Sequence, residues 1–562
     1  MSEAALRPGD KLIGAAAPPS AAAPPAYGPG SMTPRRADGS VNWTMLIVGF
    51  GAMMTGQFMA ILDIQIVAAS LPQIQAGIGA SLDEISWIQT SYLIAEVVMI
   101  PLSGFLSRLW GTRAVFMWSC AGFIVMSVAT GFATSIEQMI LFRSLQGFVG
   151  GAMIPTAFAV AFGAFPPNKR MLSSLIASMI VSLAPTFGPT LGGYLTDALS
   201  WRWLFFINVP PGLLVLVLVW KYGNFDQGDP RLAKGFDWAG LVLMAVFLMG
   251  TQYVLEEGAG ENWFEDDIVL WLTVIVAISG GAFIWRQIDH PNPIVQVRAF
   301  ADWNFTVGIV MTFVSGVALF GGTFLIPQYL AEIRGYSATQ IGTTMMVSGI
   351  GMLLTGPIAG RLAQTLDARI QMLIGFGIAG AGFWLGTFIT PDWGYWEFAL
   401  LQALRSFGLM MAMLSTQNVT MASLPPELLK SASGLVSLSR NVGGAFGLAI
   451  LATTLTQGSA AHMHELAARM SISSERAQGL LAGMTERMTA MGVADPEGAA
   501  RKAVWSMLQR EAMTLTFADA FALVAISCFA AAVLAQFGHP KKPSELGMGA
   551  GPRPGPAREP AH

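Results

Sequence analysis

Three charged side chains stand inside long apolar stretches of this sequence. Asp63 lies near the end of the stretch 43–73, Glu96 lies in the middle of the second apolar stretch, and Arg143 lies in the fourth. A charge in hydrocarbon is costly unless it faces a bundle interior or a water-filled cavity, so each of these residues indicates an ion, proton or substrate site. For Asp63 the alternative is a position near the interface, where the carboxylate is merely solvated.

Asp63 and Arg143 lie at similar distances from the outer ends of their stretches, so they can share one level in a helical bundle. Pairing with a guanidinium favours the ionised carboxylate, whereas a low dielectric favours the neutral acid. A small change in access could therefore load or release a proton. We predict that Asp63, Glu96 and Arg143 couple the protein to protons. For Glu96 the alternatives are a counter-charge for the substrate and a structural, hydrogen-bonded acid.

Composition defines the class of protein that positions these charges. Of 562 residues, 53% are hydrophobic and only 12% are charged, and the mean hydropathy is +0.56. Soluble domains carry about 25% charged residues, so the chain is a polytopic membrane protein whose surroundings are a lipid bilayer. The net charge of -3 gives no indication of a nucleic-acid partner. Cys120 and Cys528 lie within apolar runs and are interpreted as small buried hydrophobes.

Fourteen apolar stretches are long enough to span a membrane. An even number places both termini on one side. Most of the 31 Lys and Arg residues fall on that side, while the short loops of the other side hold only Arg202 and Arg334, so we predict that both termini are cytoplasmic. Residues 1–43 and 538–562 are expected to be disordered cytoplasmic tails.

The sequence contains an internal repeat. The segment 104–113 recurs as 360–369, and Arg143-Ser144-Leu145 recurs at a nearly equal separation as Arg405-Ser406-Phe407. Markers in the same order favour two parallel halves of six spans each, an architecture found in major facilitator transporters.

The domain boundaries follow from the repeat. We predict an all-α polytopic membrane protein with six-helix halves at 44–221 and 304–537 and an inserted transmembrane hairpin at 237–286. The second half contains a polar outer loop at 457–512, which we expect to form a periplasmic hairpin of amphipathic helices. The acidic segment between the hairpin spans, 256–267, is expected to be solvated.

Six segments together carry a family resemblance: Ile61 to Val67, Gly104 to Arg113, Leu141 to Gly151, Ala184 to Gly193, Trp201 to Pro210 and Ser431 to Gly447. In this combination the chain resembles the fourteen-span drug:proton antiporters of the major facilitator superfamily, specifically the EmrB/QacA group. The resemblance implies the major facilitator fold and transport by alternating access, without enzymatic activity, cofactor or metal. Alternating histidines, His462 and His464, point to different faces of a helix and give no metal site.

The segment Ala184 to Gly193 has a physical interpretation of its own. Pro185 and Pro189 remove backbone hydrogen bonds and bend the helix, while Gly188, Gly192 and Gly193 permit close approach of another backbone. The resemblance implies that this motif faces the other half of the protein and favours exchange across a sealed outer gate. The alternative is ordinary packing of small residues.

The loop after the second span is the other conformational motif. In much of the superfamily an Asp stands at the position of Arg108 and helps to lock the inner gate. That acid is absent here, so we expect Asp367 and Arg369 to provide a substitute, or else simple positive-inside anchoring. The conformational residues that we predict in this loop are Gly104, Arg108, Gly111 and Arg113.

Buried polar and aromatic residues are candidates for a substrate cavity. They are Gln57, Trp87, Tyr92, Gln146, Arg405 and Arg440. Because Arg405 and Arg440 belong to the second half and the buried acids to the first, the cavity could be polarised and take amphiphilic anions as well as lipophilic cations. The alternative is that both arginines cap helix carbonyls or belong to each half's gate.

No nucleotide-binding loop of the GxxxxGK[ST] type is present, so an ion gradient should supply the energy. We predict a proton antiporter of the bacterial inner (cytoplasmic) membrane that exports small hydrophobic or amphiphilic substrates. The resemblance also implies a periplasmic adaptor and an outer-membrane channel as partners. The alternatives are an exporter of an endogenous anionic lipid or fatty acid, a proton symporter and a non-transporting sensor.

Overall fold

The computed structural model describes residues 32–538 except 37, 39, 69, 167–168 and 470–474. Most of both predicted tails, 1–31 and 539–562, lies outside the described residues. Within the described chain, thirteen helices are long and apolar enough to cross a membrane, and the bent helix α8 makes fourteen. This confirms the predicted all-α polytopic membrane protein. Met32, inside the predicted tail, is buried, so the packed structure begins earlier than expected.

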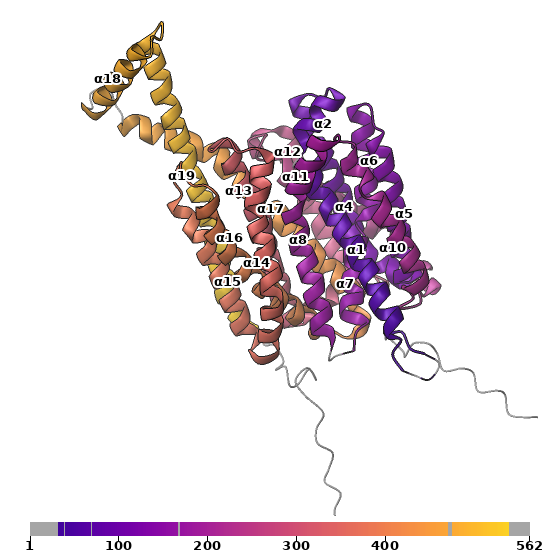
Figure 1. Ribbon diagram of the computed structural model, residues 1–562. Coiled ribbons are helices and arrows are strands. Elements are labelled where there is room, and N and C mark those ends of the chain that lie inside the picture. The colour runs from indigo at the N-terminus through magenta and orange to yellow at the C-terminus, as the bar shows by residue number, and fades with distance from the viewer. Residues whose placement is uncertain are drawn as a thin grey trace, which may run out of the picture.

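The first half of the chain forms one group of packed helices (Figure 1). Its members are α1 (Trp43–Ala68), α4 (Trp87–Trp110), α5 (Thr112–Gly131), α6 (Ile136–Gly150), α7 (Met153–Gly163), α8 (Arg170–Ala198), α9 (Trp203–Phe206) and α10 (Val209–Tyr222), with the short α2 (Leu71–Ile78) and α3 (Leu82–Ile85) between α1 and α4. Helices α6 and α7 together make one span, as do α9 and α10.

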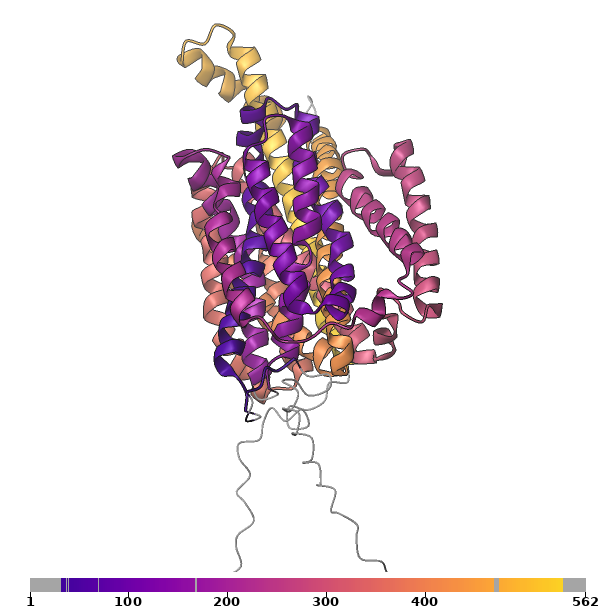
Figure 2. The ribbon, with the colours of Figure 1, turned by 90° about the vertical axis from the view of Figure 1, so that its right-hand side faces the viewer.

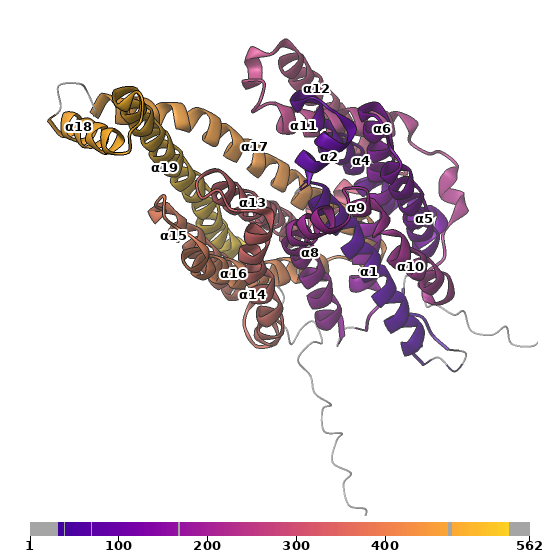
Figure 3. The same cartoon turned by 45° about the horizontal axis from the view of Figure 1, so that its top comes forward.

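The second half forms a similar group beside the first, and Figure 3 shows the two groups next to each other. Its members are α13 (Trp303–Glu332), α14 (Ala338–Thr365), α15 (Ala368–Leu385), α16 (Tyr395–Ala422), α17 (Leu429–Arg469) and α19 (Pro496–Leu534). Side-chain caps begin these helices where the sequence turns polar: Asp302 accepts from the Phe305 amide at 2.9 Å, and Ser337 forms a capping box with Gln340. We call the bundle end where α1 begins and α19 ends the terminal face, and the opposite end the distal face.

The inserted hairpin consists of α11 (Trp238–Glu257) and α12 (Asp267–Asp289) and stands at one side of the bundle (Figure 2). The buried side chain of Asp237 connects the start of α11 to the end of α12. It accepts hydrogen bonds from the Gly240 amide at 2.8 Å and from Gln287 at 3.1 Å, and it pairs with Arg286 at 2.5 Å. The outermost helix, α12, exposes a row of large apolar side chains, as a lipid-facing helix does.

The polar outer segment contains helices, and two of them are continuations of membrane spans. Helix α17 runs unbroken for 41 residues and α19 for 39, so both extend beyond the bundle, where α18 (Glu475–Ala490) joins them (Figure 1). The Ala-rich stretches 459–468 and 499–512 favour helix, so the spanning helices continue after their apolar parts end. The extension is therefore built on two rigid spans.

Candidate functional site

Asp63 and Arg143 form an ion pair in the interior of the first half. Arg143 Nη1 lies 2.6 Å from Asp63 Oδ2, and both side chains have no solvent exposure. The pair joins α1 to α6, which are separated in the sequence by helices α2 to α5. Glycine makes the approach of α6 to α4 possible, because a Cβ at Gly147 would overlap the Tyr92 carbonyl.

The second oxygen of Asp63 is occupied by amides. Asn208 Nδ2 donates to Oδ1 at 2.7 Å, and Gln146 Nε2 donates to the same oxygen at 3.3 Å. Asn208 lies between α9 and α10, where its side chain is buried, and its Nδ2 also donates to Ser127 Oγ at 3.1 Å. Sequence reasoning did not select Asn208. The signal was its place in the segment Trp201 to Pro210, where Val209 alone separates it from two prolines.

Arg143 is held by more than the carboxylate. Its guanidinium lies 4.2 Å from the centre of the Tyr92 ring, its Nε donates to the Ile88 carbonyl at 3.4 Å, and its Nη1 donates to Gln146 Oε1 at 3.0 Å. These contacts fix the guanidinium whether or not Asp63 is ionised. The structure thus places Gln146 and Tyr92 in the charge cluster around Asp63.

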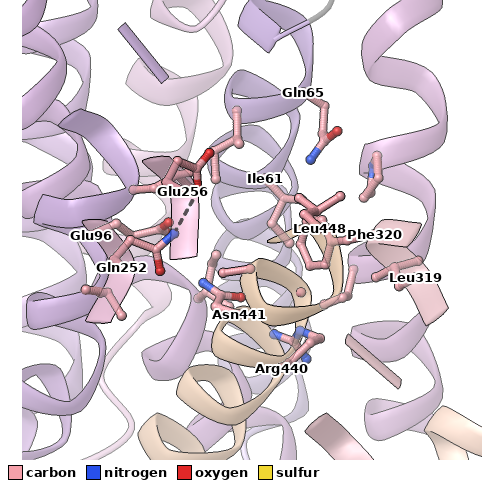
Figure 4. Close-up of a pocket in the computed structure, with 18 residues that line it drawn as sticks. Ile61, Gln65, Glu96, Gln252, Glu256, Leu319, Phe320, Arg440, Asn441 and Leu448 are labelled. Atoms are coloured by element: carbon pink, nitrogen blue, oxygen red, sulfur yellow. Dashed lines mark hydrogen bonds between the residues drawn. The ribbon is translucent and has the colours of Figure 1, made fainter. Parts of the chain in front are cut away.

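A narrow cavity of about 70 Å³ lies between the halves, next to this cluster (Figure 4). Ile61, Ile64 and Gln65 of α1 line it, whereas Asp63 points behind them. The charged residues that line the cavity are Glu96, Arg440 and Glu256, and Glu96 and Arg440 are 2% and 3% exposed. Drug-sized ligands need a cavity of about 300 Å³ or more, so the halves must move apart to admit one.

Glu256 corrects the expectation that the whole acidic segment of the hairpin is solvated. It belongs to the last turn of α11, and its carboxylate accepts a hydrogen bond from Gln252 at 3.3 Å inside the cavity lining. The prediction failed because α11 continues helically through both glutamates, which turns Glu256 toward the bundle. Its neighbour Glu257 instead accepts from Thr90 of α4 at 3.1 Å.

Several predicted cavity residues lie elsewhere. Gln57 is buried in α1 with neither amide atom partnered among the described residues, and Trp87 packs on Tyr253 of α11 at 5.9 Å. Arg405 is fully buried, donates to Ser348 Oγ at 2.6 Å and lies against Gly322. Of the predicted cavity candidates, Arg440 alone is among the residues that line this cavity.

Helix α8 bends by 44° between its segments Arg170–Pro185 and Phe187–Ala198. Two glycines of the motif, Gly188 and Gly192, face α1, whereas Thr190 of the same motif lies against Gly342 of α14 in the other half. A Cβ at Gly188 would overlap Gln65, and one at Gly192 would lie 2.9 Å from the Ile66 carbonyl oxygen. The absence of side chains at both glycines therefore lets α1 pack closely against α8. Because they sit on the face toward α1, they tie the bent helix to the segment that follows Asp63. Pro185 lines the cavity, Pro189 is half-buried, and Gly193 is buried.

At the terminal face, the conformational loop contacts the second half directly. A Cβ at Gly104 would lie 2.9 Å from the Lys430 carbonyl oxygen at the start of α17, and Lys430 Nζ donates to the Ser107 carbonyl at 3.1 Å. Gly111 adopts φ +86°, a left-handed conformation that favours glycine. Arg108 donates to the Pro293 carbonyl at 3.0 Å, and Arg113 is half-buried.

Asp226 supplies the acid that the loop lacks. It comes from the linker between α10 and α11, forms an ion pair with Lys430, and accepts from the Thr112 amide at 2.8 Å. The expected substitute, Asp367 with Arg369, is a local contact of 3.8 Å at the start of α15, because Asp367 caps that helix. We call the contacts of Asp226 and Lys430 with Ser107 and Thr112 the terminal lock.

Two further hydrogen bonds join the halves near the terminal face. Ser174 of α8 contacts Asn418 of α16 at 2.8 Å, and Ser178 contacts Gln417 at 2.8 Å. With the terminal lock, these bonds close the cavity toward that face. Among the described residues, no group of three or more His, Cys, Asp or Glu side chains is arranged to hold a metal.

Comparison with family models and known sequences relates the chain to membrane transporters. The family model described as "Major Facilitator Superfamily" matches residues 53–448. The chain is 37% identical over 496 residues to the colistin resistance protein EmrB of Acinetobacter baumannii, covering 87% of this chain and 95% of the relative. It is 31% identical to the multidrug export protein EmrB of Escherichia coli, covering 80% and 89%. It is 28% identical to the fatty acid resistance protein FarB of Neisseria gonorrhoeae, covering 79% and 89%.

Among solved structures, the chain resembles the crystal structure of the human organic anion transporter MFSD10 (TETRAN). The TM-score is 0.55 at 12% sequence identity, and the match covers 86% of this chain and 99% of that one. At this identity the likeness concerns the fold alone.

Proposed function

The chain belongs to the Major Facilitator Superfamily, and we propose that this multi-pass membrane transporter is a proton-coupled antiporter that exports hydrophobic or amphiphilic compounds by alternating access. Relatives named for colistin resistance and multidrug export support this function. The terminal face is the cytoplasmic one in this proposal, because the Lys and Arg residues gather there. The membrane is the bacterial inner membrane.

One observation carries the proposal: the Asp63–Arg143 pair is sealed from solvent directly behind the wall of the cavity between the halves. A buried ion pair is sensitive to loss of either charge, because the remaining charge is left without compensation. Protonation of Asp63 releases the guanidinium from the carboxylate, while Tyr92 and the Ile88 carbonyl still hold it. A change in the protonation of Asp63 thereby alters contacts between α1, α4 and α6.

We propose a transport cycle in which these contacts form and break in turn. Asp63 takes up a proton while the cavity communicates with the outside, the terminal lock opens, and the halves rock to face the cytoplasm. Substrate then enters the cavity, the proton leaves to the cytoplasm, and Asp63 pairs again with Arg143. The lock closes beneath the substrate, which is released outward. Bent α8 transmits the change, since its glycines pack on α1 just beyond Asp63.

A second candidate is export of an anionic lipid or fatty acid. It is favoured by Arg440, which lines the cavity and whose buried Nη1 has no hydrogen-bond partner among the described residues. The name of the Neisseria relative points in the same direction. This candidate differs from the first in substrate and not in coupling.

The extension formed by α17, α18 and α19 is the proposed docking surface for a periplasmic adaptor, which would connect the transporter to an outer-membrane channel. It stands clear of the bundle on the distal face (Figure 1). Its polar, amphipathic helices suit a contact with another soluble protein.

Transport in inside-out membrane vesicles tests the function. An imposed pH gradient, acid inside, should drive accumulation of a lipophilic cation or dye, since the vesicle lumen corresponds to the outside of the cell. A symporter would accumulate the compound when the gradient is reversed. A sensor would bind the compound without accumulation in either gradient.

A further inference from the structure

The inserted hairpin forms part of the cavity wall. Helix α11 packs against α4 of the first half and α17 of the second half, so it contacts both moving parts of the transporter. Gln252 and Glu256 lie one helical turn apart on the same face of α11 and both line the cavity (Figure 4). The hairpin is therefore more than a lipid-facing addition to the fold.

The charges around the cavity do not balance. Glu96 and Arg440, one from each half, lie close enough to attract each other electrostatically. Glu256 accepts a hydrogen bond from the neutral amide of Gln252, and none of the described Lys, Arg or His residues forms an ion pair with it. When all three groups are ionised, the lining carries one uncompensated negative charge, located at the hairpin.

The remaining lining suits the apolar part of an amphiphile. Leu319, Phe320 and Leu448 come from the second half, and Phe320 offers an aromatic surface to a flat or cationic ligand. Arg440 is almost fully buried, yet its Nη1 has no hydrogen-bond partner within the described structure. An unpaired guanidinium nitrogen suits an anionic group, so a preference of the cavity for cations must come from Glu256.

We propose that Glu256 binds the positive end of monovalent amphiphilic cations, so that the hairpin selects cations over anions of the same shape. The inference rests on the proposed export function and adds the charge of its substrates. Proton coupling stays with Asp63, which has its own partners and does not line the cavity. Substrate charge and proton are thus held by two different carboxylates.

Two ions of nearly the same shape and opposite charge test this assignment: tetraphenylphosphonium and tetraphenylborate. Their binding to the purified full-length protein is measured for the wild type, Glu256→Gln and the matched control Glu257→Gln. Each variant is compared with the wild type for the same ion, because the two ions partition differently into detergent and lipid. We expect Glu256→Gln to weaken tetraphenylphosphonium binding about tenfold or more and not to weaken tetraphenylborate binding. The control should change neither affinity.

A second variant, Gln252→Lys, keeps the test valid if Glu256→Gln does not fold. It places a fixed positive charge next to Glu256 and should also weaken tetraphenylphosphonium binding. Unchanged affinity for the cation in a folded Glu256→Gln or Gln252→Lys protein would overturn the inference. If the wild type exchanged protons for substrate in that case, the proposed function would stand; if it moved no protons with any compound, the proposed function itself would fail.

Discussion

Lys430, in the first turn of α17, pairs with Asp226 of the linker that leads into the inserted hairpin, and its ammonium also donates to the Ser107 carbonyl. One lysine of the second half is thereby tied to the first half and to the linker. Both side chains are mostly buried, at 14% and 8% exposure, so solvent screens the pair less than a surface pair. The terminal lock is a contact that must break before the cavity opens toward this face.

The lock predicts the effect of Asp226→Asn. Loss of the charge should favour opening and speed hydrogen–deuterium exchange about 5- to 30-fold in segments 104–112 and 429–436, as expected for 1 to 2 kcal/mol. Asp229→Asn is the control, since Asp229 is an acid of the same linker that caps a local turn. Equal exchange in both variants and the wild type would show that the pair does not hold this face closed.

The two buried arginines of the repeat should respond differently to substitution. Arg143→Met leaves the Asp63 carboxylate buried without its cation, a situation that costs about 3–5 kcal/mol. Arg405→Met removes a buried charge whose partner is the neutral Ser348 hydroxyl, so its effect on stability should be small or favourable. Thermal unfolding of the purified variants measures the difference. A larger loss in Arg405→Met would contradict the assignment of the ion pair to the first half alone.

Substitution of glycine by alanine should change the stability of the protein differently at two positions. Gly188→Ala should lower stability by about 1–3 kcal/mol, because the new methyl group overlaps Gln65 and pushes α1 away from α8. Gly51→Ala, in α1 itself, meets open space and should be neutral or stabilise the helix by about 0.5–1 kcal/mol. Unfolding temperatures of both variants check the prediction. If Gly188→Ala were as stable as Gly51→Ala, helix packing at Gly188 would be looser than the structure shows.

Asp237 predicts a pH-dependent contribution at the base of the hairpin. Burial raises its pKa, but the hydrogen bonds from the Gly240 amide, Arg286 and Gln287 outweigh burial and hold the pKa below its ordinary value. A lowered pKa means that the stabilisation is present above the unfolded pKa of about 3.9 and is lost as the pH falls through the folded value.

Replacement of this residue should therefore matter at neutral pH. Asp237→Ala should cost about 1–3 kcal/mol near pH 7, through the lost cap and the unpaired Arg286, and the difference from the wild type should shrink below about pH 4. Melting curves recorded across this pH range measure both effects. A difference that grows on acidification would contradict the sign of the pKa shift.

Much of the fold was accessible from the sequence, because the spans are apolar runs and the halves repeat their markers. The common depth of Asp63 and Arg143 also followed from helix geometry, and the structure shows the two in contact. Asn208 was harder to identify, since its approach to Asp63 depends on tertiary packing and not on a charge pattern.

The contacts made by polar segments between the spans and at their ends could not be predicted from the sequence, for a physical reason. The partner of Lys430 comes from a linker without periodicity, so nothing in the local pattern selects Asp226 over Asp229 or Asp237. Glu256 was assigned to solvent because an acidic cluster after a span usually marks its end, whereas α11 keeps its helical turn through Glu257. In both cases tertiary contacts decided what the local sequence left open.

The central claim, that Asp63 carries the coupled proton, is tested most directly by substrate-driven pH change in proteoliposomes. Wild type, Asp63→Asn and Glu96→Gln are compared with a lipophilic cation, a neutral dye and a long-chain fatty acid. We predict proton movement opposite to substrate in the wild type, at least a tenfold loss in Asp63→Asn, and retained coupling in Glu96→Gln, because Glu96 lines the cavity outside the Asp63 cluster. Full coupling in Asp63→Asn, or its loss in Glu96→Gln alone, would contradict the account.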